Sequence, residues 1–212
     1  MNSHQNPLLP AALLPLMMDI SGEDEVPEPA AASAGCCQCC GYPAARLWQG
    51  ARSALAVPHG VCTLCYLTGH LDSPSAALGR IAWLPGLSAV DAIHLQRRAL
   101  IAALAGNKTQ RREGRRILLW LFRHARETEN AWGSAHAGEF AQAMRRLPPE
   151  KRQALRVRLG ECALIMPPDA DAFKNLSLLL PAGKSAEAVL RTRHWHTHNR
   201  SDPNAKYSDT LG

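Results

Sequence analysis

The stretches Cys36-Cys37-Gln38-Cys39-Cys40-Gly41 and Val61-Cys62-Thr63-Leu64-Cys65 decide the fold of this 212-residue chain. They contain two CxxC pairs, with 21 residues between Cys40 and Cys62. Four thiolates can close a tetrahedral Zn²⁺ site, and each CxxC turn holds two sulfurs about one metal. The spacing therefore predicts one structural zinc ion, and the expected ligands are Cys37, Cys40, Cys62 and Cys65.

The crowded cysteines leave other interpretations open. Cys36 and Cys39 form a competing register of the first pair, but only the pair that ends at Cys40 is followed directly by a glycine, Gly41, whose backbone suits a tight knuckle. Two disulfides, or reduced cysteines without metal, would also account for these residues. Cys162 lies alone in an apolar stretch and is expected in the core.

The N-terminal region favours a reducing compartment. Its apolar run, Leu8 to Met18, is interrupted by Pro10 and Pro15, and no Lys or Arg precedes Arg46, so the basic region of a secretory signal is missing. No run of 18 apolar residues indicates a transmembrane helix. We therefore expect a cytoplasmic protein without direct membrane insertion, in which disulfides do not persist.

Charge divides the chain into an acidic head and a basic body. Residues 1–45 carry five acidic and no basic residues, whereas residues 46–212 carry 24 basic and 13 acidic residues. The Pro/Ala-rich head predicts a disordered arm over residues 1–34, which either screens or mimics an acidic partner or is only a solvated tail. One domain is expected over residues 35–195 and a disordered tail over 196–212.

Hydrophobic spacing predicts a mostly helical body with short extended segments. The apolar stretch 78–85 ends in a proline and predicts a strand or an extended segment, and 164–168 is a second short apolar stretch stopped by proline. Ser88 with Asp91 forms a near capping box, and the apolar stripe that follows is broken only by Arg97 and ends at Gly106. Further helices are expected over 110–128, 135–147, 149–161, 169–179 and 185–193.

The helix expected over 110–128 begins with a basic cluster of Arg111, Arg112, Arg115 and Arg116. Cations are unfavourable near a helix N-terminus because of the macrodipole, so an anion could lie there. A solvated run of arginines is the other interpretation. Positive charge of this size permits contact with nucleic acid or with an acidic protein segment, and does not choose between them.

The chain offers little for catalysis, and no catalytic residue is predicted. Residues 41–61, between the cysteine pairs, contain no Asp, Glu or Asn and only one histidine, His59. A catalytic divalent cation prefers oxygen ligands, so hydrolysis by this segment is not expected. His70 is a conceivable substitute zinc ligand, and His194, His196 and His198 would share one face of an extended segment and could bind a transition metal.

Beyond these patterns, the chain resembles the IcmJ/DotN family of type IVB (Dot/Icm-like) secretion and conjugation systems. The resemblance spans about residues 36–168. It is carried by Cys37-Gln-Cys-Cys40-Gly-Tyr-Pro-Ala44, by Val61-Cys-Thr-Leu-Cys65 and by Gly79-Arg-Ile-Ala-Trp-Leu-Pro-Gly-Leu-Ser88, and more weakly by the basic helix and by Leu164-Ile-Met-Pro167.

The resemblance implies an α+β, mostly helical fold, in which a small HNH-like zinc-knuckle region without nuclease activity is followed by several short helices. It also implies an adaptor of the coupling-protein subcomplex. Its partners would be the C-terminal segment of a coupling ATPase and other secretion-system adaptors, and it would reach the inner membrane through them. Two features depart from the family: Gly86 stands where an acidic residue is usual, and the N-terminal arm replaces a folded lead-in.

Three functions compete at this point. A zinc-stabilised, non-enzymatic adaptor is the leading hypothesis, and a DNA-binding or vestigial HNH-nuclease-like protein of plasmid transfer is the alternative. A CxxC redox protein is disfavoured because neither pair opens a thioredoxin-like βαβ unit. Trp83, Leu84 and Leu87 would either line a groove for a partner helix or pack the core.

Overall fold

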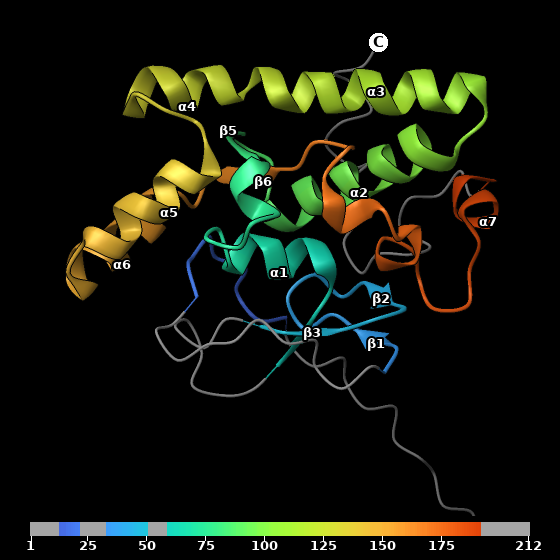
Figure 1. Cartoon of the computed structure of the whole chain (residues 1–212), viewed down its shortest axis with the longest axis horizontal. Coiled ribbons are helices and arrows are strands. Elements are labelled where there is room, and N and C mark those ends of the chain that lie inside the picture. The colour runs from blue at the N-terminus through green and yellow to red at the C-terminus, as the bar shows by residue number, and fades with distance from the viewer. Residues whose placement is uncertain (1–12, 22–32, 51–58, 192–212) are drawn as a thin grey trace, which may run out of the picture.

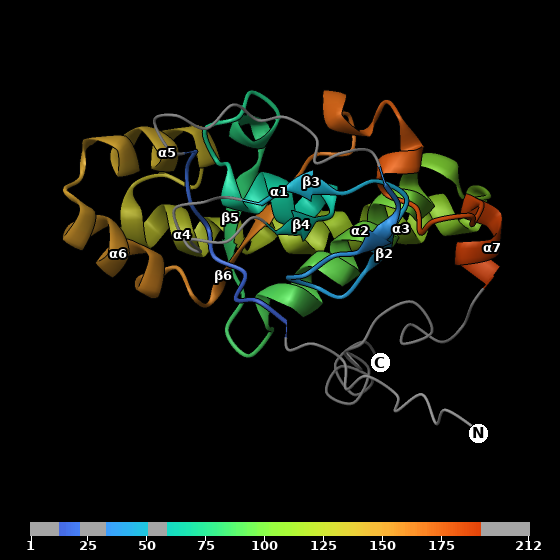
Figure 2. The ribbon, with the colours of Figure 1, turned by 90° about the horizontal axis from the view of Figure 1, so that it is seen from below.

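Short antiparallel strand pairs and a larger set of helices make up the protein, as the sequence predicts for an α+β, mostly helical fold (Figure 1). The computed structural model describes residues 13–21, 33–50 and 59–191. The cysteine-rich strands and helix α1 lie on one side of the long helices α2 and α3. Helices α5 and α6 lie at one end of the long axis and α7 at the other, as Figure 2 also shows.

The cysteine-rich region consists of two small hairpin-like pairs followed by a helix. Strand β1 (Gly35–Cys36) pairs with β2 (Pro43–Ala44), and β3 (Trp48–Gln49) pairs with β4 (Gly60–Val61), each antiparallel. The first pair encloses the Cys37–Cys40 turn, and Gly41 has a φ of 71°, a left-handed value that glycine adopts without a steric penalty. Helix α1 (Thr63–Gly69) follows β4 directly, and all its residues are buried.

The two proline-bounded apolar stretches contribute strands that pair with each other. Strand β5 (Arg80–Trp83), after the short 3₁₀ turn η1 (Ala76–Leu78), runs antiparallel to β6 (Cys162–Ile165). Cys162 is buried in β6, as expected for a core residue. The buried Gln96 side chain from α2 (Ala89–Ala105) donates to the carbonyl of Leu164 and accepts from the amide of Met166, which fixes that helix on β6.

Helices α2 and α3 (Lys108–Arg123) form a closely packed pair. The Ser88 hydroxyl accepts from the amide of Asp91 at 3.1 Å and caps α2 as predicted, and Gly106 ends the helix. Asn107 and Gln110 form a capping box that starts α3. Gly114 allows the close approach, because a Cβ there would lie 2.5 Å from the carbonyl oxygen of Ala99.

The single helix expected over 110–128 is wrong, because the chain forms two helices. Helix α3 ends at Arg123, and α4 (Ala125–Trp132) begins after His124, whose amide bonds back to the carbonyls of Leu121 and Phe122. Helices α5 (Ala137–Arg146) and α6 (Pro149–Arg158) confirm the next two predictions, with Pro149 at the start of α6.

The helix expected over 169–179 is also wrong. This segment forms two 3₁₀ turns, η2 (Asp171–Phe173) and η3 (Leu176–Leu178). The Asn175 side chain accepts from the amide and the hydroxyl of Ser177, and such local bonds compete with a continuous helix. Helix α7 (Ala186–Arg191) follows, within the range predicted for the last helix.

Residues 13–21 correct part of the expected N-terminal arm, because they pack on the domain. Met18, Asp19 and Ile20 are buried, and the Asp19 carboxylate pairs with Arg156 at 2.7 Å. The apolar residues of this segment are buried against the domain, and the acidic composition of residues 1–45 does not indicate this burial. The remainder of the arm (1–12 and 22–32) and the tail expected over 196–212 lie outside the described residues.

Among the helices that the structure describes, none is both long and apolar enough to cross a membrane.

Candidate metal centre

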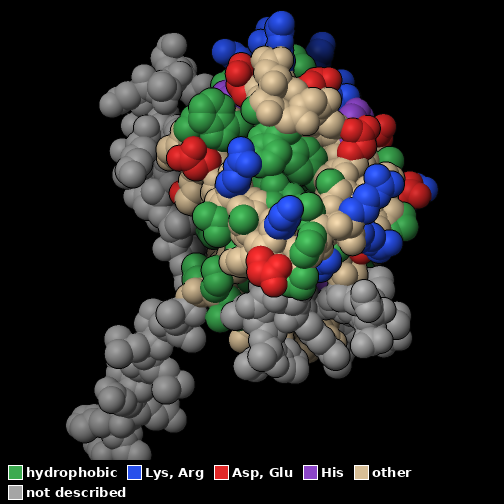
Figure 3. Space-filling model, turned by 90° about the vertical axis from the view of Figure 1, so that its left-hand side faces the viewer, with side chains coloured by type: hydrophobic (Ala, Val, Ile, Leu, Met, Phe, Trp, Pro, Cys, Tyr) green, Lys and Arg blue, Asp and Glu red, His purple; other side chains and the backbone are tan. Residues whose placement is uncertain are grey.

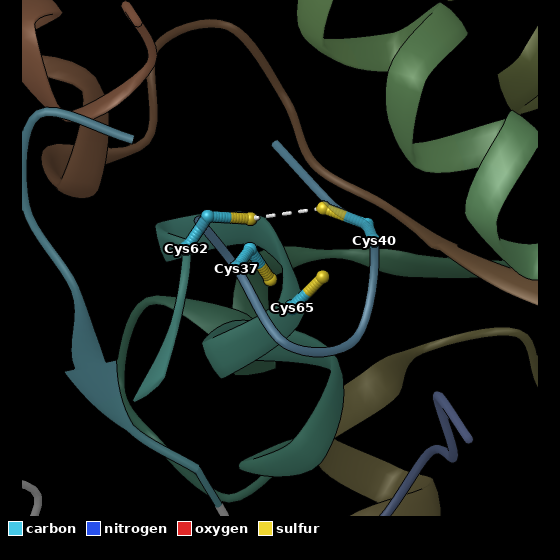
Figure 4. Close-up of side chains that lie close together, drawn as sticks. All are labelled: Cys37, Cys40, Cys62 and Cys65. Carbon is cyan, nitrogen blue, oxygen red and sulfur yellow. Dashed lines mark hydrogen bonds between the residues drawn. The ribbon is translucent and has the colours of Figure 1, made fainter. Parts of the chain in front are cut away.

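Four cysteine sulfurs from two segments converge on one point. Cys37 and Cys40 lie in the turn between β1 and β2, Cys62 is the N-cap of α1, and Cys65 lies in its first turn. Their sulfur atoms all lie within 4.8 Å of one another, and all four residues are buried (Figure 4). The structure thus brings together the four residues that the spacing singled out.

The sulfur geometry suits a tetrahedral metal ion. Cys40 Sγ and Cys62 Sγ are 3.7 Å apart. Bonds of about 2.3 Å to a tetrahedral Zn²⁺ place ligand sulfurs about 3.8 Å from each other, whereas a disulfide requires about 2.05 Å. All seven cysteines are free thiols, so the disulfide interpretation fails and the cluster can hold a metal ion.

The structure also selects the register of the first pair. Cys36 is exposed on β1, and Cys39 is buried but lies outside the cluster. Burial, with smaller contributions from Cys37 and Cys62, raises the pKa of the Cys39 thiol to about 12, so this side chain remains a protonated core residue. Cys37 and Cys40 are therefore the pair available to a metal.

Backbone hydrogen bonds hold the first turn in shape and join it to the second cysteine pair. The amide of Cys37 donates to the carbonyl of Tyr42, and the amide of Gly41 donates to the carbonyl of Cys37, both at 2.8 Å. Gln38 exchanges two bonds with Gly60 of β4, just before Cys62. The two halves of the cluster are thus positioned by the fold as well as by any bound ion.

A buried arginine from α2 lies beside the cysteine sulfurs. Arg97 is 3% exposed, and its Nη2 lies 2.8 Å from Cys62 Sγ. Its guanidinium carbon lies 3.7 Å from the centre of the Tyr42 ring, which is close enough for a cation–π contact. This residue is the single break in the predicted apolar stripe of α2. That break is the one feature of the sequence that points to Arg97, although the sequence analysis assigned Arg97 no role.

His94, one turn earlier on α2, fixes the arginine against the first cysteine turn. An arginine can only donate, so His94 Nδ1 accepts from Arg97 Nη1 at 3.0 Å and His94 Nε2 donates to the carbonyl of Cys40 at 3.0 Å. Burial, followed by the charge of Arg97, lowers the pKa of His94 to about 3, which keeps the imidazole neutral. Sequence reasoning missed this residue as well.

The electrostatics of the cluster match an anionic site. Burial opposes the charge of Arg97, but Cys62, Cys40, Tyr42 and Cys65 raise its pKa above the usual value. Burial likewise opposes ionisation of Cys62, yet the other three thiols and then Arg97 hold its pKa well below the usual value. The buried cation therefore has thiolate as its counter-charge.

The other histidines singled out from the sequence do not join this cluster. His70 is buried, with its Nδ1 at 2.8 Å from the carbonyl of Tyr66, and His59 lies just before β4. No other group of metal-ligating side chains occurs in the described part of the chain. His194, His196 and His198 lie outside it.

The candidate groove residues divide between core and surface. Leu84 and Leu87 are buried in a second small core between the β5–β6 pair and α3. Trp83 is 41% exposed and donates from its indole nitrogen to Glu161 at 3.2 Å. Only the tryptophan is thus available to a partner.

Comparison of the chain with protein-family models, with curated proteins and with solved structures found no match.

Proposed function

We propose that this protein is a zinc-stabilised, non-enzymatic adaptor. The observation that carries the zinc proposal is the convergence of four buried cysteine sulfurs beside the buried Arg97. Cys37, Cys40, Cys62 and Cys65 would hold the ion, and a bound Zn²⁺ would cross-link the β1–β2 turn to α1. A tetrathiolate zinc site carries a net charge of about −2, and Arg97 offsets part of it in a place that water does not reach.

The arrangement favours a structural ion over a catalytic one. Catalytic zinc sites keep one position open for water or substrate, whereas four protein thiolates close the coordination shell. Arg97 donates to the sulfur of Cys62, and the neutral His94 accepts from Arg97 and holds it in place, so these two side chains stabilise thiolate and do not activate a nucleophile. We therefore propose that the centre supplies folding free energy and has no hydrolytic role.

The adaptor role is supported by the resemblance to the IcmJ/DotN family across residues 36–168. The order of a cysteine turn, a strand pair and a helix also agrees with an HNH-like region that has lost its catalytic groups. On this basis we propose that the partners are the C-terminal segment of a coupling ATPase and other secretion-system adaptors. Through them the protein would reach the inner membrane from the cytoplasm.

Co-expression with the C-terminal segment of a coupling ATPase from the same genome tests this role. The two proteins should elute together in gel filtration at micromolar concentration and moderate salt. Cys62→Ser should lose both the zinc and the complex, whereas the matched variant Cys36→Ser, which changes an exposed cysteine outside the cluster, should keep both. Separate elution of the wild-type proteins would refute the adaptor assignment.

The basic face of α3 favours a second candidate function, binding of nucleic acid. Arg112, Arg115, Arg116 and Arg123 are exposed there, and none forms an ion pair within the described residues. Arginines four residues apart repel each other, and the first turn holds no acidic residue. Trp120, 39% exposed, lies one turn beyond Arg116 and offers a ring for base stacking.

Binding of a labelled DNA duplex separates the two candidates. If α3 binds phosphates, the double variant Arg115→Gln/Arg116→Gln should reduce the slope of log affinity against log salt by about two, because two phosphate contacts are lost. The control Arg146→Gln/Lys174→Gln removes the same charge elsewhere and should leave the slope unchanged. Equal slopes in all three proteins would leave the adaptor as the remaining candidate.

A further inference from the structure

Residues 13–21, the N-terminal segment, form neither helix nor strand and lie between the α5–α6 end and α1, as the dark blue ribbon of Figure 2 shows. Asp19 joins the segment to the end of α1 by main-chain bonds. Its amide donates to the carbonyl of Thr68 at 3.1 Å, and its carbonyl accepts from the amide of Leu71 at 2.8 Å. Main-chain bonds also hold extended peptides in the grooves that bind them. The segment therefore lies on the domain as a peptide lies on its receptor.

The groove beneath the segment contains a buried cation, Arg156 of α6. Its side chain is 10% exposed, and its Nη2 lies 2.7 Å from both carboxylate oxygens of Asp19. Its buried Nε has no hydrogen-bond partner within the described residues. An arginine binds a carboxylate most strongly through two nitrogens, one for each oxygen. Asp19 therefore leaves one donor of Arg156 unused.

Apolar packing beneath the segment is incomplete as well. A hollow of about 140 Å³ lies between Leu16, Met17 and Met18 of the segment and residues of α2, α6 and β6. Arg156 also lines this hollow. Protein interiors leave few spaces larger than a water molecule, because unfilled apolar space forgoes dispersion contacts. The segment occupies its groove but does not fill it.

The larger hollows at the α4–α6 end do not select a partner by charge. They measure about 540 and 360 Å³, and their linings include both cations and carboxylates, those of Lys151, Arg158, Glu127 and Glu139. Figure 3 shows this end, with hydrophobic side chains in the middle of the face and charges of both signs around them. The groove beneath the N-terminal segment instead combines a buried cation with an apolar lining.

We propose that the groove beneath the N-terminal segment is a peptide-binding site, which this segment occupies until an extended segment of a partner protein displaces it. The partner segment presents apolar side chains that fill the hollow and a carboxylate that engages both Nε and Nη2 of Arg156. The N-terminal segment of a second copy would leave the same hollow and the same unused donor, so exchange between copies gains nothing. The inference rests on the adaptor role proposed above and gives that role a binding site.

Displacement requires a better ligand, because a segment of the same chain competes at an effective concentration on the order of millimolar. A weaker competitor makes the site accessible to added peptides. In the full-length variant Asp19→Ala the segment has lost its carboxylate, whereas Arg156 is retained. This variant is therefore the receptor for the binding test.

The probes are three fluorescent peptides with the sequence of residues 13–21: unchanged, with Asp19→Ala and with Asp19→Glu. Fluorescence anisotropy with the Asp19→Ala protein should show at least about tenfold tighter binding of the unchanged peptide than of the Asp19→Ala peptide. The Asp19→Glu peptide, with its longer side chain, should bind at least as tightly as the unchanged one. The wild-type protein should bind both carboxylate peptides about tenfold more weakly, because its own segment competes. Equal binding of peptides with and without the carboxylate, or equal binding by the two proteins, would overturn the proposal.

Matched double variants locate the binding site. Asp19→Ala/Arg156→Gln removes both charges of the buried pair, and this protein should no longer prefer the carboxylate peptides. Asp19→Ala/Arg158→Gln removes the same positive charge at an exposed position on α6, outside the 140 Å³ hollow, and should keep the preference. Circular dichroism verifies that both variants fold. A preference that survives Arg156→Gln would place the peptide elsewhere and contradict the proposal.

Hydrogen exchange of the wild-type protein tests displacement itself. A saturating Asp19→Glu peptide should lower the protection of the Leu14 and Asp19 amides, which donate to the carbonyls of Gln38 and Thr68. Unchanged protection would show that the segment stays in place and would refute displacement.

The remaining outcomes separate the groove from the adaptor role. A wild-type homodimer that excess peptide dissociates would assign the groove to a second copy and overturn the proposal. Loss of the peptide preferences while the ATPase segment still co-elutes would contradict the groove alone. Separate elution of the wild type and the ATPase segment, with the peptide preferences intact, would contradict the adaptor role alone.

Discussion

The cysteine-rich region and the α5–α6 end of the molecule differ in how they are packed. In the first, strands of only two residues lie beside α1, whose residues are all buried, and four buried sulfurs with Arg97 lie at the centre. In the second, regular helices stand beside open hollows, and α6 buries none of its residues. A region with little regular structure therefore has the buried centre, and a region of regular helices has the open surface.

The difference lies in what fixes each region. Two-residue strand pairs are too short to be stable alone, so the cysteine-rich region depends on cross-links between its segments. Helices α5 and α6 are ten residues each and also depend on packing, which α5 supplies by burying one apolar face while α6 remains only partly covered by the described residues. The contrast predicts that loss of the bound metal unfolds the cysteine-rich region, and that substitutions on the exposed face of α6 are tolerated.

The largest effect is expected from loss of a metal ligand. Cys62→Ser should release the ion and unfold residues 33–50 and 59–71 first, since structural zinc contributes on the order of 10 kcal/mol to the folding of small domains. Hydrogen exchange should show loss of protection in β1–β4 and α1, with α3 retained longer. Cys36→Ser is the control, and uniform loss of protection across the chain would contradict the division into two regions.

A smaller but still severe effect is expected at Arg97. Arg97→Met removes the buried cation beside Cys62 and leaves the thiolates uncompensated, which should cost about 3–5 kcal/mol of unfolding free energy in urea. It should also increase zinc loss to a chromophoric chelator about 10- to 100-fold. The control Arg112→Met, at an exposed position on α3, should change neither value. A stable Arg97→Met protein with unchanged zinc retention would show that Arg97 does not stabilise the metal centre.

The ion pair between the N-terminal segment and α6 should rank third. Asp19→Ala leaves Arg156 without its carboxylate in a place where the arginine side chain is 10% exposed, so we expect a loss of about 2–3 kcal/mol. The control, Asp171→Ala, breaks a pair whose two side chains are both 76% exposed, and should change the stability by less than about 1 kcal/mol. Urea unfolding followed by circular dichroism gives both values, and equal losses would contradict the docking of residues 13–21.

The smallest effect is expected on the open face of α6. Val157→Lys changes a side chain that is 67% exposed, and the unfolding free energy should stay within about 0.5 kcal/mol of the wild type. The same urea measurement applies. A loss of more than about 1.5 kcal/mol would show that α6 is held by contacts stronger than its exposure indicates.

Much of this architecture is predictable from local sequence. The cysteine spacing placed the cluster, the Ser88 cap placed the start of α2, and the proline-bounded apolar stretches placed β5 and β6. These features share one property, that the residues deciding them are close together in the chain. Local patterns therefore describe the knuckle and most helix boundaries well.

The errors in the predicted fold arise where contacts between distant residues, or local hydrogen bonds, determine the structure. The break at His124 depends on backbone hydrogen bonds, and the 3₁₀ turns around Asn175 depend on bonds to the Asn175 side chain; hydrophobic spacing predicts neither. The docking of Asp19 depends on Arg156, 137 residues away. In the sequence Arg97 is only an interruption of an apolar stripe. Its role depends on the cysteine cluster that packs against α2, which the local pattern does not show.

The metal content of the protein purified from cells tests the central claim most directly. Native mass spectrometry with X-ray absorption at the zinc edge should find one zinc per chain, surrounded by four sulfurs at about 2.3 Å. Chelation at neutral pH should remove the zinc and the structure of residues 33–50 and 59–71 together. A folded protein that lacks metal, or that holds iron in place of zinc, would contradict the account.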